Sequence, residues 1–234
     1  MYYGLKIKPP FLEIGPKAYL YGEEMLALAK AIDAVAIKYD VDIIVTPQYT
    51  DIRLLAENTE RILIFAQHMD CLPVGRGLGS VLPEAVKAAG AVGVMLNHAE
   101  KPLTQDILQQ TICRADEVGL GTIVCADSVE EVGAVAKMGP NLIVAEPTEL
   151  IGTGQASDMD YVKQTIETVR TINPDIMVLQ GAGISNGQDV YNVIKAGAQA
   201  TGSTSGIIKA ADPAAMTEEM IAALRRAWDE LHSI

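Results

Sequence analysis

The chain contains few aromatic side chains. Phenylalanine, tryptophan and tyrosine together make up 5% of its 234 residues. Alanine, valine, isoleucine and leucine must therefore fill the core. A core of this kind suits strands that are buried on both faces, as in parallel sheets. The shortage of aromatics thus favours buried parallel strands.

Cysteines and long apolar runs are also scarce. The three cysteines are Cys71, Cys113 and Cys125, and neither their number nor their spacing predicts a disulfide framework or a metal site. No apolar run approaches the roughly 18–20 residues of a membrane-spanning helix, and the first residues do not resemble a secretion signal. We therefore expect a cytoplasmic protein that does not bind membranes.

Basic residues are outnumbered by acidic ones. Lysine and arginine total 18 against 30 aspartates and glutamates, so the formal net charge is -12 at pH 7. An acidic surface repels the phosphate backbone of nucleic acids, which argues against nucleic-acid binding. A small phosphorylated ligand would need local help from backbone N–H groups and a lysine.

Short runs rich in β-branched residues alternate with amphipathic stretches along the whole chain. This alternation predicts a parallel sheet, and eight units in a chain of this length predict a closed (β/α)8 TIM barrel of class α/β. No linker or change of composition marks a second domain, so residues 1–234 are expected to form a single one. The predicted strands are Phe11–Gly15, Asp42–Thr46, Arg61–Ala66, Ala91–Leu96, Thr122–Ala126, Leu142–Glu146, Ile176–Gln180 and Ala198–Ser203.

Helices are predicted between these strands from apolar residues at helical spacing. Thr104 is a candidate N-cap, and four glycines lie just beyond helical runs, where a left-handed residue ends a helix. The glycines are Gly90, Gly119, Gly139 and Gly197. The predicted helices are Glu23–Tyr39, Asp51–Ala56, Leu82–Ala89, Thr104–Val118, Val129–Met138, Asp158–Thr171, Gly187–Ala196 and Pro213–Leu231.

Reactive side chains follow several of the predicted strands. In such barrels the active site lies at the carboxyl ends of the strands, where this sequence places Lys17, His98 and Glu146. Glycine-bearing loops lie nearby, and backbone N–H groups can approach a phosphate closely where side chains are absent. The pattern predicts a phosphate ligand and acid–base chemistry.

Each of these residues also has an ordinary structural interpretation. Glu146 could form a salt bridge at a strand end, His98 could be a hydrogen-bonded structural histidine, and Lys17 could be a solvated surface lysine. His68 has a stronger structural interpretation, as a bridge between backbone groups. His232, near the end of the chain, is expected to be uninvolved.

Two segments resemble hallmark sequences of the triosephosphate isomerase family. They are Asn97-His98-Ala99-Glu100 and the nine residues from Glu146 to Gly154, Glu-Pro-Thr-Glu-Leu-Ile-Gly-Thr-Gly. The segments Ala66–Asp70 and Gly181–Ser185 are similar to the compact archaeal branch of the same family. The resemblance extends, in order, over nearly the whole chain.

The resemblance implies an aldose–ketose isomerase that moves a proton through an enediolate and needs no cofactor. Its substrates would be glyceraldehyde 3-phosphate and dihydroxyacetone phosphate. Glu146 would be the base, neutral His98 would polarise the carbonyl, Lys17 would stabilise developing negative charge, and Glu100 would support them. Residues 147–154 would form a lid. The implied phosphate-binding residues are Gly152, Gly183, Ser185, Thr204 and Ser205.

Three positions depart from the family pattern. Gly15 replaces an asparagine, Ala99 replaces a serine, and Leu78 replaces a threonine in a loop that reaches across the subunit interface. Two alternatives therefore stay open: an isomerase or epimerase of a related ketose phosphate such as a tetrulose 4-phosphate, and a non-catalytic phosphate-binding homologue. The resemblance also implies a homodimer or homotetramer that assembles through residues 66–85.

Overall fold

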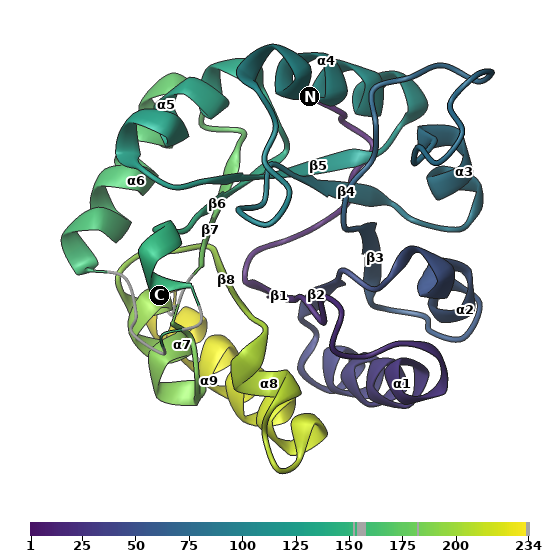
Figure 1. Ribbon diagram of the computed structural model, residues 1–234. Helices are drawn as coiled ribbons and strands as arrows, with labels where there is room; N and C mark the ends of the chain where they lie inside the picture. Colours follow the sequence, from purple (N-terminus) through teal and green to yellow (C-terminus); the bar gives the residue numbers. More distant parts are fainter. Residues whose placement is uncertain (152, 154–157, 182, 233–234) are drawn as a thin grey trace.

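Eight parallel strands close into a barrel in the computed structural model, which describes residues 1–151, 153, 158–181 and 183–232. The strands pair in sequence order, and β8 pairs with β1 to close the ring (Figure 1). The predicted (β/α)8 barrel is confirmed. The strands are β1 (Phe11–Ile14), β2 (Asp42–Val45), β3 (Leu63–Ala66), β4 (Gly93–Leu96), β5 (Gly121–Ala126), β6 (Leu142–Ala145), β7 (Met177–Gln180) and β8 (Ala200–Ser203).

Helices surround the barrel and lie between consecutive strands (Figure 1). None of those in the described part of the chain is both long and apolar enough to cross a membrane. Two short 3-10 turns, η1 (Tyr49–Asp51) and η2 (Thr148–Leu150), follow β2 and β6. The helices are α1 (Gly22–Tyr39), α2 (Ile52–Ala56), α3 (Pro83–Ala88), α4 (Gln105–Val118), α5 (Val129–Met138), α6 (Met159–Ile172), α7 (Gly187–Lys195), α8 (Ser205–Ile208) and α9 (Pro213–His232).

The helix ends agree with most of the sequence predictions. All four glycines predicted beyond helices have positive φ, between 73° at Gly139 and 105° at Gly90. Thr104 does occupy the N-cap position of α4, but its side chain makes no capping hydrogen bond, so the predicted cap is wrong in its mechanism. Helix α8 was not predicted, because four residues are too few to show a helical period.

Two apolar layers hold the barrel together. The larger layer lies between the strands and the helices, and a smaller cluster includes Phe11, Ile44, Phe65 and Leu142 from four of the strands. Gly93 makes room for this cluster, since a Cβ there would lie 2.1 Å from the Phe65 ring. This packed interior leaves the carboxyl ends of the strands for polar side chains.

Candidate active site

A cavity of about 360 Å³ opens at the carboxyl ends of the strands, and every strand or the loop after it contributes to its lining. The cavity brings together most of the site residues expected from the sequence, whose roles stay predictions. Gly152 lies outside the described residues, as does Gly154 of the expected lid. The expected residues that line the cavity are Lys17, His98, Glu100, Glu146, Gly183, Ser185, Thr204 and Ser205.

Lys17 sits in a tight turn after β1 and has a φ of 48°, which is uncommon for a residue other than glycine. Two side-chain amides hold this turn by donating to the Lys17 carbonyl oxygen: Nε2 of Gln48 at 2.7 Å and Nε2 of Gln67 at 2.8 Å. Gln67 also donates to the carbonyl of Thr46 at 2.9 Å. The ends of β1, β2 and β3 are thereby tied together, and the Lys17 backbone is fixed.

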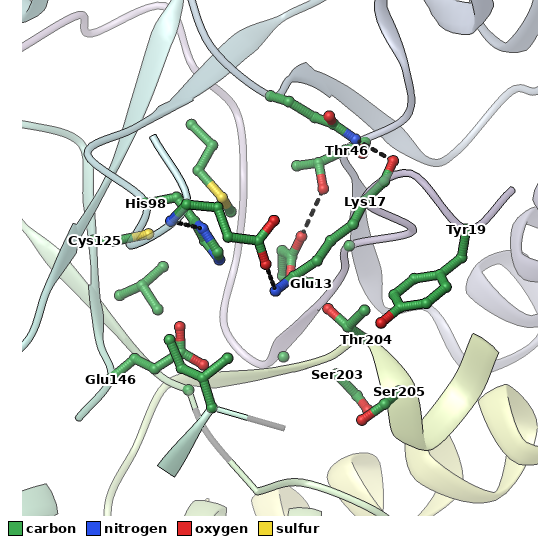
Figure 2. Close-up of a pocket in the computed structure, with 18 of the residues that line it drawn as sticks. Glu13, Lys17, Tyr19, Thr46, His98, Cys125, Glu146, Ser203, Thr204 and Ser205 are labelled. Atoms are coloured by element: carbon green, nitrogen blue, oxygen red, sulfur yellow. Dashed lines mark hydrogen bonds and ion pairs between the residues drawn. The ribbon is translucent and has the colours of Figure 1, made fainter. Parts of the chain in front are cut away.

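An ion pair links two loops that border the cavity. The Lys17 ammonium donates to Oε1 of Glu100 over 2.6 Å, so the loop after β1 meets the loop after β4 (Figure 2). The hydrogen bond from Lys17 lowers the pKa of the Glu100 carboxyl, an effect that partial burial opposes. The pair orients the Lys17 side chain over the cavity.

His98 is held so that one ring nitrogen is defined as an acceptor. The backbone N–H of Glu100 donates to its Nδ1 at 3.0 Å, so a neutral imidazole carries its proton on Nε2. Burial lowers the pKa of His98, and the Lys17 charge lowers it further, while Glu100 acts in the opposite direction. The neutral His98 ring can therefore donate a hydrogen bond from its Nε2–H.

Asn97 shapes the loop that carries His98. Its φ of 58° lies in the left-handed region, which asparagine tolerates better than most residues. Its Nδ2 donates to the carbonyl of Cys125 on β5 at 3.0 Å, and its Oδ1 accepts from the N–H of Leu103 at 3.0 Å. These bonds close the loop and anchor it to the neighbouring strand.

Glu146 follows the last residue of β6, and its backbone N–H donates to the carbonyl oxygen of Ala126 at 2.9 Å. Its side chain rests against the backbone of Gly181, where a Cβ would lie 3.0 Å from the Glu146 Cβ and 3.1 Å from its Oε1. The lack of a side chain at residue 181 thus defines the space in which the carboxylate sits. Ile151, from the described part of the expected lid, lines the same cavity.

The loops after β7 and β8 join at the side of the cavity where a phosphate is expected. Ser203 Oγ donates to the carbonyl of Ile184 at 2.8 Å, and a Cβ at Gly206 would lie 2.6 Å from the same oxygen. The N–H of Ser185 already donates to Asp189 Oδ2 at 2.9 Å. An anion held by this N–H must share or replace that bond, which the sequence did not indicate.

Several residues of the cavity were missed by the sequence analysis. Glu13 lies on β1 and only 8% of it is exposed; the sequence signal was an acid inside the apolar run Phe-Leu-Glu-Ile. Lys209 lies over the ring of Tyr19, 5.1 Å from its centroid, and both line the cavity. The sequence signal for Lys209 was a lysine shortly after the serine- and threonine-rich turn that follows β8.

Of the other two histidines, His68 also lines the cavity, whereas His232 lies on α9. His68 is buried, and its Nε2 lies 3.3 Å from Asp70 Oδ1. Asp70 in turn accepts from the N–H of Val81 at 2.7 Å, which closes the loop after β3. His232 stacks on Trp228 of its own helix, with ring centroids 3.9 Å apart. Among the described residues, no group of three or more histidine, cysteine, aspartate or glutamate side chains could hold a metal ion.

Comparison with known proteins gives a consistent result. The family model described as triosephosphate isomerase matches residues 10–220. The chain is 41% identical over 209 residues to the triosephosphate isomerase of Methanobacterium bryantii, a match that covers 87% of this chain and 92% of that protein. It is 39% identical to the triosephosphate isomerase of Methanosarcina barkeri, over 91% of this chain and 97% of the other. The corresponding protein of Sulfurisphaera tokodaii is 37% identical, over 95% of this chain and 99% of its own length.

Proposed function

The chain belongs to the triosephosphate isomerase family, and we propose that it interconverts glyceraldehyde 3-phosphate and dihydroxyacetone phosphate. The observation that carries the proposal is that Lys17, His98 and Glu146, from three different strand ends, line one cavity. A carboxylate, a neutral imidazole and an ammonium are the groups that this proton transfer requires.

Glu146 is the proposed base. Its carboxylate takes a proton from the carbon beside the substrate carbonyl, and the electron pair of that C–H bond moves toward the carbonyl to form an enediolate. A proton then returns to the neighbouring carbon, and the remaining hydroxyl proton moves from one oxygen to the other, so that the carbonyl is re-formed one carbon away. Contact with Gly181 limits the positions that the carboxylate can adopt, which keeps its approach to the two carbons defined.

His98 and Lys17 stabilise the charge that develops on oxygen. The Nε2–H of His98 is free of the bond that occupies Nδ1 and can donate to the carbonyl oxygen. Triosephosphate isomerase is a known case of a glutamate base that works with a neutral histidine. The Lys17 ammonium adds a positive charge at the same end of the cavity.

The phosphate group is assigned to the loops after β7 and β8, with the lid closing over it. Gly183 has a φ of 72°, a conformation that suits an exposed turn of backbone N–H groups. Thr204 is the N-cap of α8, Ser205 is its first residue, and both line the cavity. The N–H groups of a first helical turn lack acceptors within the helix. Residues 147–154, Gly152 among them, are the proposed lid that excludes water.

We also propose self-association and a cytoplasmic location. The loop between β3 and α3 carries exposed apolar side chains, and Leu78 at its tip is fully exposed. A partner subunit would cover such a side chain.

The proposed cytoplasmic location has a separate basis. All three cysteines are free, which is compatible with a reducing compartment.

The proposed function is tested by coupled turnover assays of the purified protein on both triose phosphates, with a tetrulose 4-phosphate alongside. We expect triose turnover with kcat/KM above about 10⁶ M⁻¹s⁻¹ and loss of at least about 10³-fold in Glu146→Gln. Stronger turnover of the tetrulose phosphate would support the alternative substrate. Ligand binding without any turnover would support a non-catalytic role; neither alternative has more support in the comparisons than the triose reaction.

A further inference from the structure

Glu13 is a buried carboxyl group inside the active-site cavity to which the proposed mechanism gives no role. It follows Phe11 of the inner apolar cluster by two residues, so both point into the barrel. Figure 2 shows its carboxyl near the centre of the cavity, between Thr46 and the end of the Lys17 side chain. It lines the cavity together with the proposed catalytic residues. Glu13 is therefore within the space that a substrate would enter.

The Glu13 carboxyl fits only because two neighbouring residues lack side chains. The register pairs Glu13 with Gly202 of β8, and a Cβ there would lie 2.9 Å from Glu13 Oε2. A Cβ at Gly15 would lie 3.1 Å from Glu13 Oε1, 3.2 Å from Thr204 Oγ1 and 3.4 Å from Thr46 Oγ1. Three oxygens thus gather beside the Gly15 backbone.

Gly15 is also the position at which the resemblance to the triosephosphate isomerase family implies an asparagine. An asparagine side chain at residue 15 would press on the Glu13 carboxyl in its present position. The space left empty at Gly15 adjoins the space that the Glu13 carboxyl fills. The two features are therefore coupled.

We propose that the Glu13 carboxyl supplies to the substrate the hydrogen bond that Gly15 cannot, by donating to a substrate oxygen beside Lys17. This inference rests on the proposed isomerase function and adds a substrate-binding residue to it. Glu13 Oε1 accepts from Thr46 Oγ1 at 3.0 Å, so the orientation of the carboxyl is fixed. The other oxygen, on the side of Gly202, is the one assigned to the substrate.

The surroundings of Glu13 favour its protonated state. Burial raises its pKa to about 7; the hydrogen bond from Thr46 opposes this rise, the Glu146 carboxylate adds to it, and the Lys17 charge opposes it. A protonated carboxyl donates a hydrogen bond, whereas an ionised one only accepts. Near neutral pH, a large fraction of Glu13 can therefore act as a donor.

Other groups around Glu13 leave this assignment unchanged. Cys125 on β5 is buried, and burial raises the pKa of its thiol, so it stays uncharged. His98 is held neutral by its lowered pKa. The paired strands β2 and β8 present Thr46 and Gly202, which do not titrate. Glu146 and Lys17 are thus the charged groups that act on Glu13, and they act in opposite directions, while burial has the larger effect on its pKa.

The test compares Glu13→Gln with Glu13→Val in steady-state kinetics on the triose phosphates between pH 5.5 and 9. Glutamine keeps a donor at every pH, and valine removes it. At pH 5.5, where Glu13 is mostly protonated, we expect kcat/KM to fall about 10- to 100-fold in Glu13→Val and to stay within about 3-fold of wild type in Glu13→Gln. We also expect kcat/KM of the wild type to decline as pH rises through about 7, and the decline to be absent from Glu13→Gln.

A swap variant keeps the inference testable if Glu13→Val is poorly folded. Gly15→Asn alone should lose activity, because the new side chain meets the Glu13 carboxyl, and Glu13→Val with Gly15→Asn should recover at least about 10-fold over either single variant. Wild-type turnover with no loss in Glu13→Val, or equal losses in the valine and glutamine variants with no recovery in the swap, would overturn the inference alone. Absence of wild-type triose turnover would overturn the proposed function and this inference with it.

Discussion

The backbone N–H of Glu100 donates to Nδ1 of His98 across 3.0 Å, and this bond decides which ring nitrogen faces the chemistry. Because Nδ1 is an acceptor, the proton of the neutral ring lies on Nε2. The same three-residue segment, His98 to Glu100, places the Glu100 carboxylate on the Lys17 ammonium at 2.6 Å. One short turn after β4 therefore orients both the proposed electrophile and the proposed cation.

Removal of the His98 donor should slow the chemical step and leave the fold intact. We expect kcat on the triose phosphates to fall about 10²- to 10⁴-fold in His98→Asn, with KM changed much less, because the Nε2–H bond strengthens as charge develops. The matched control is His232→Asn, since His232 is exposed on α9 and stacks on Trp228. A His98→Asn variant with wild-type kcat would exclude His98 as the electrophile.

Gly181 should prove necessary for the position of Glu146. A Cβ at residue 181 would lie 3.1 Å from the Glu146 Oε1, so Gly181→Ala should displace the carboxylate and lower kcat about 10-fold or more. The control is Gly133→Ala within α5, where a Cβ would lie 3.4 Å from Thr168 and alanine should favour the helix by about 1 kcal/mol. Equal activities of the two variants would contradict this account of Glu146.

Glu13 should make the stability of the protein depend on pH. Burial raises its pKa from the ordinary value of 4.5 to about 7, so the folded state binds more protons than the unfolded state between these values. Stability should therefore fall as pH rises from 4.5 to about 7, by on the order of 3 kcal/mol in total. Urea unfolding of wild type and Glu13→Gln at pH 5 and pH 8, at equal protein concentration, measures this loss. An identical pH dependence in the two proteins would show that the folded-state pKa of Glu13 is not raised.

The exposed loop tip at Leu78 should contribute to self-association. Replacing the fully exposed Leu78 by aspartate should weaken the assembly, because a charge would be placed where a partner covers an apolar side chain. Sedimentation velocity at micromolar concentration should show a dimer or tetramer of the 25.0 kDa chain and a smaller species for Leu78→Asp. A wild type that sediments only as a monomer would rule out the proposed assembly.

The barrel could be predicted from the sequence because the pattern of one strand followed by one helix repeats along the chain. Eight apolar runs separated by helical patterns leave few alternatives, and the observed strands begin or end within two residues of the predicted limits. Lys17, His98 and Glu146 could be placed together for the same reason, since parallel strands bring their carboxyl ends to one edge. Helix α8 could not be predicted, because a single turn has no period.

The features that were missed depend on the folded arrangement of the strands and loops. The position of Glu13 follows from the register that pairs it with Gly202 of β8, nearly the whole chain away. The bond from the Ser185 N–H to Asp189 depends on how the loop after β7 enters α7. An acid inside Phe-Leu-Glu-Ile and an aspartate four residues after a serine are weak signals, so the folded structure is needed to show that Glu13 is a cavity residue and that the Ser185 N–H is already occupied.

Solvent isotope incorporation tests the central claim, proton transfer through an enediolate by Glu146, most directly. The protein is given dihydroxyacetone phosphate in D₂O, and the glyceraldehyde 3-phosphate formed is trapped and examined by NMR. The account predicts product with solvent deuterium on the carbon next to the aldehyde, formed by wild type and lost together with turnover in Glu146→Gln. Product without solvent deuterium on that carbon, or labelled product formed at the wild-type rate by Glu146→Gln, would contradict it.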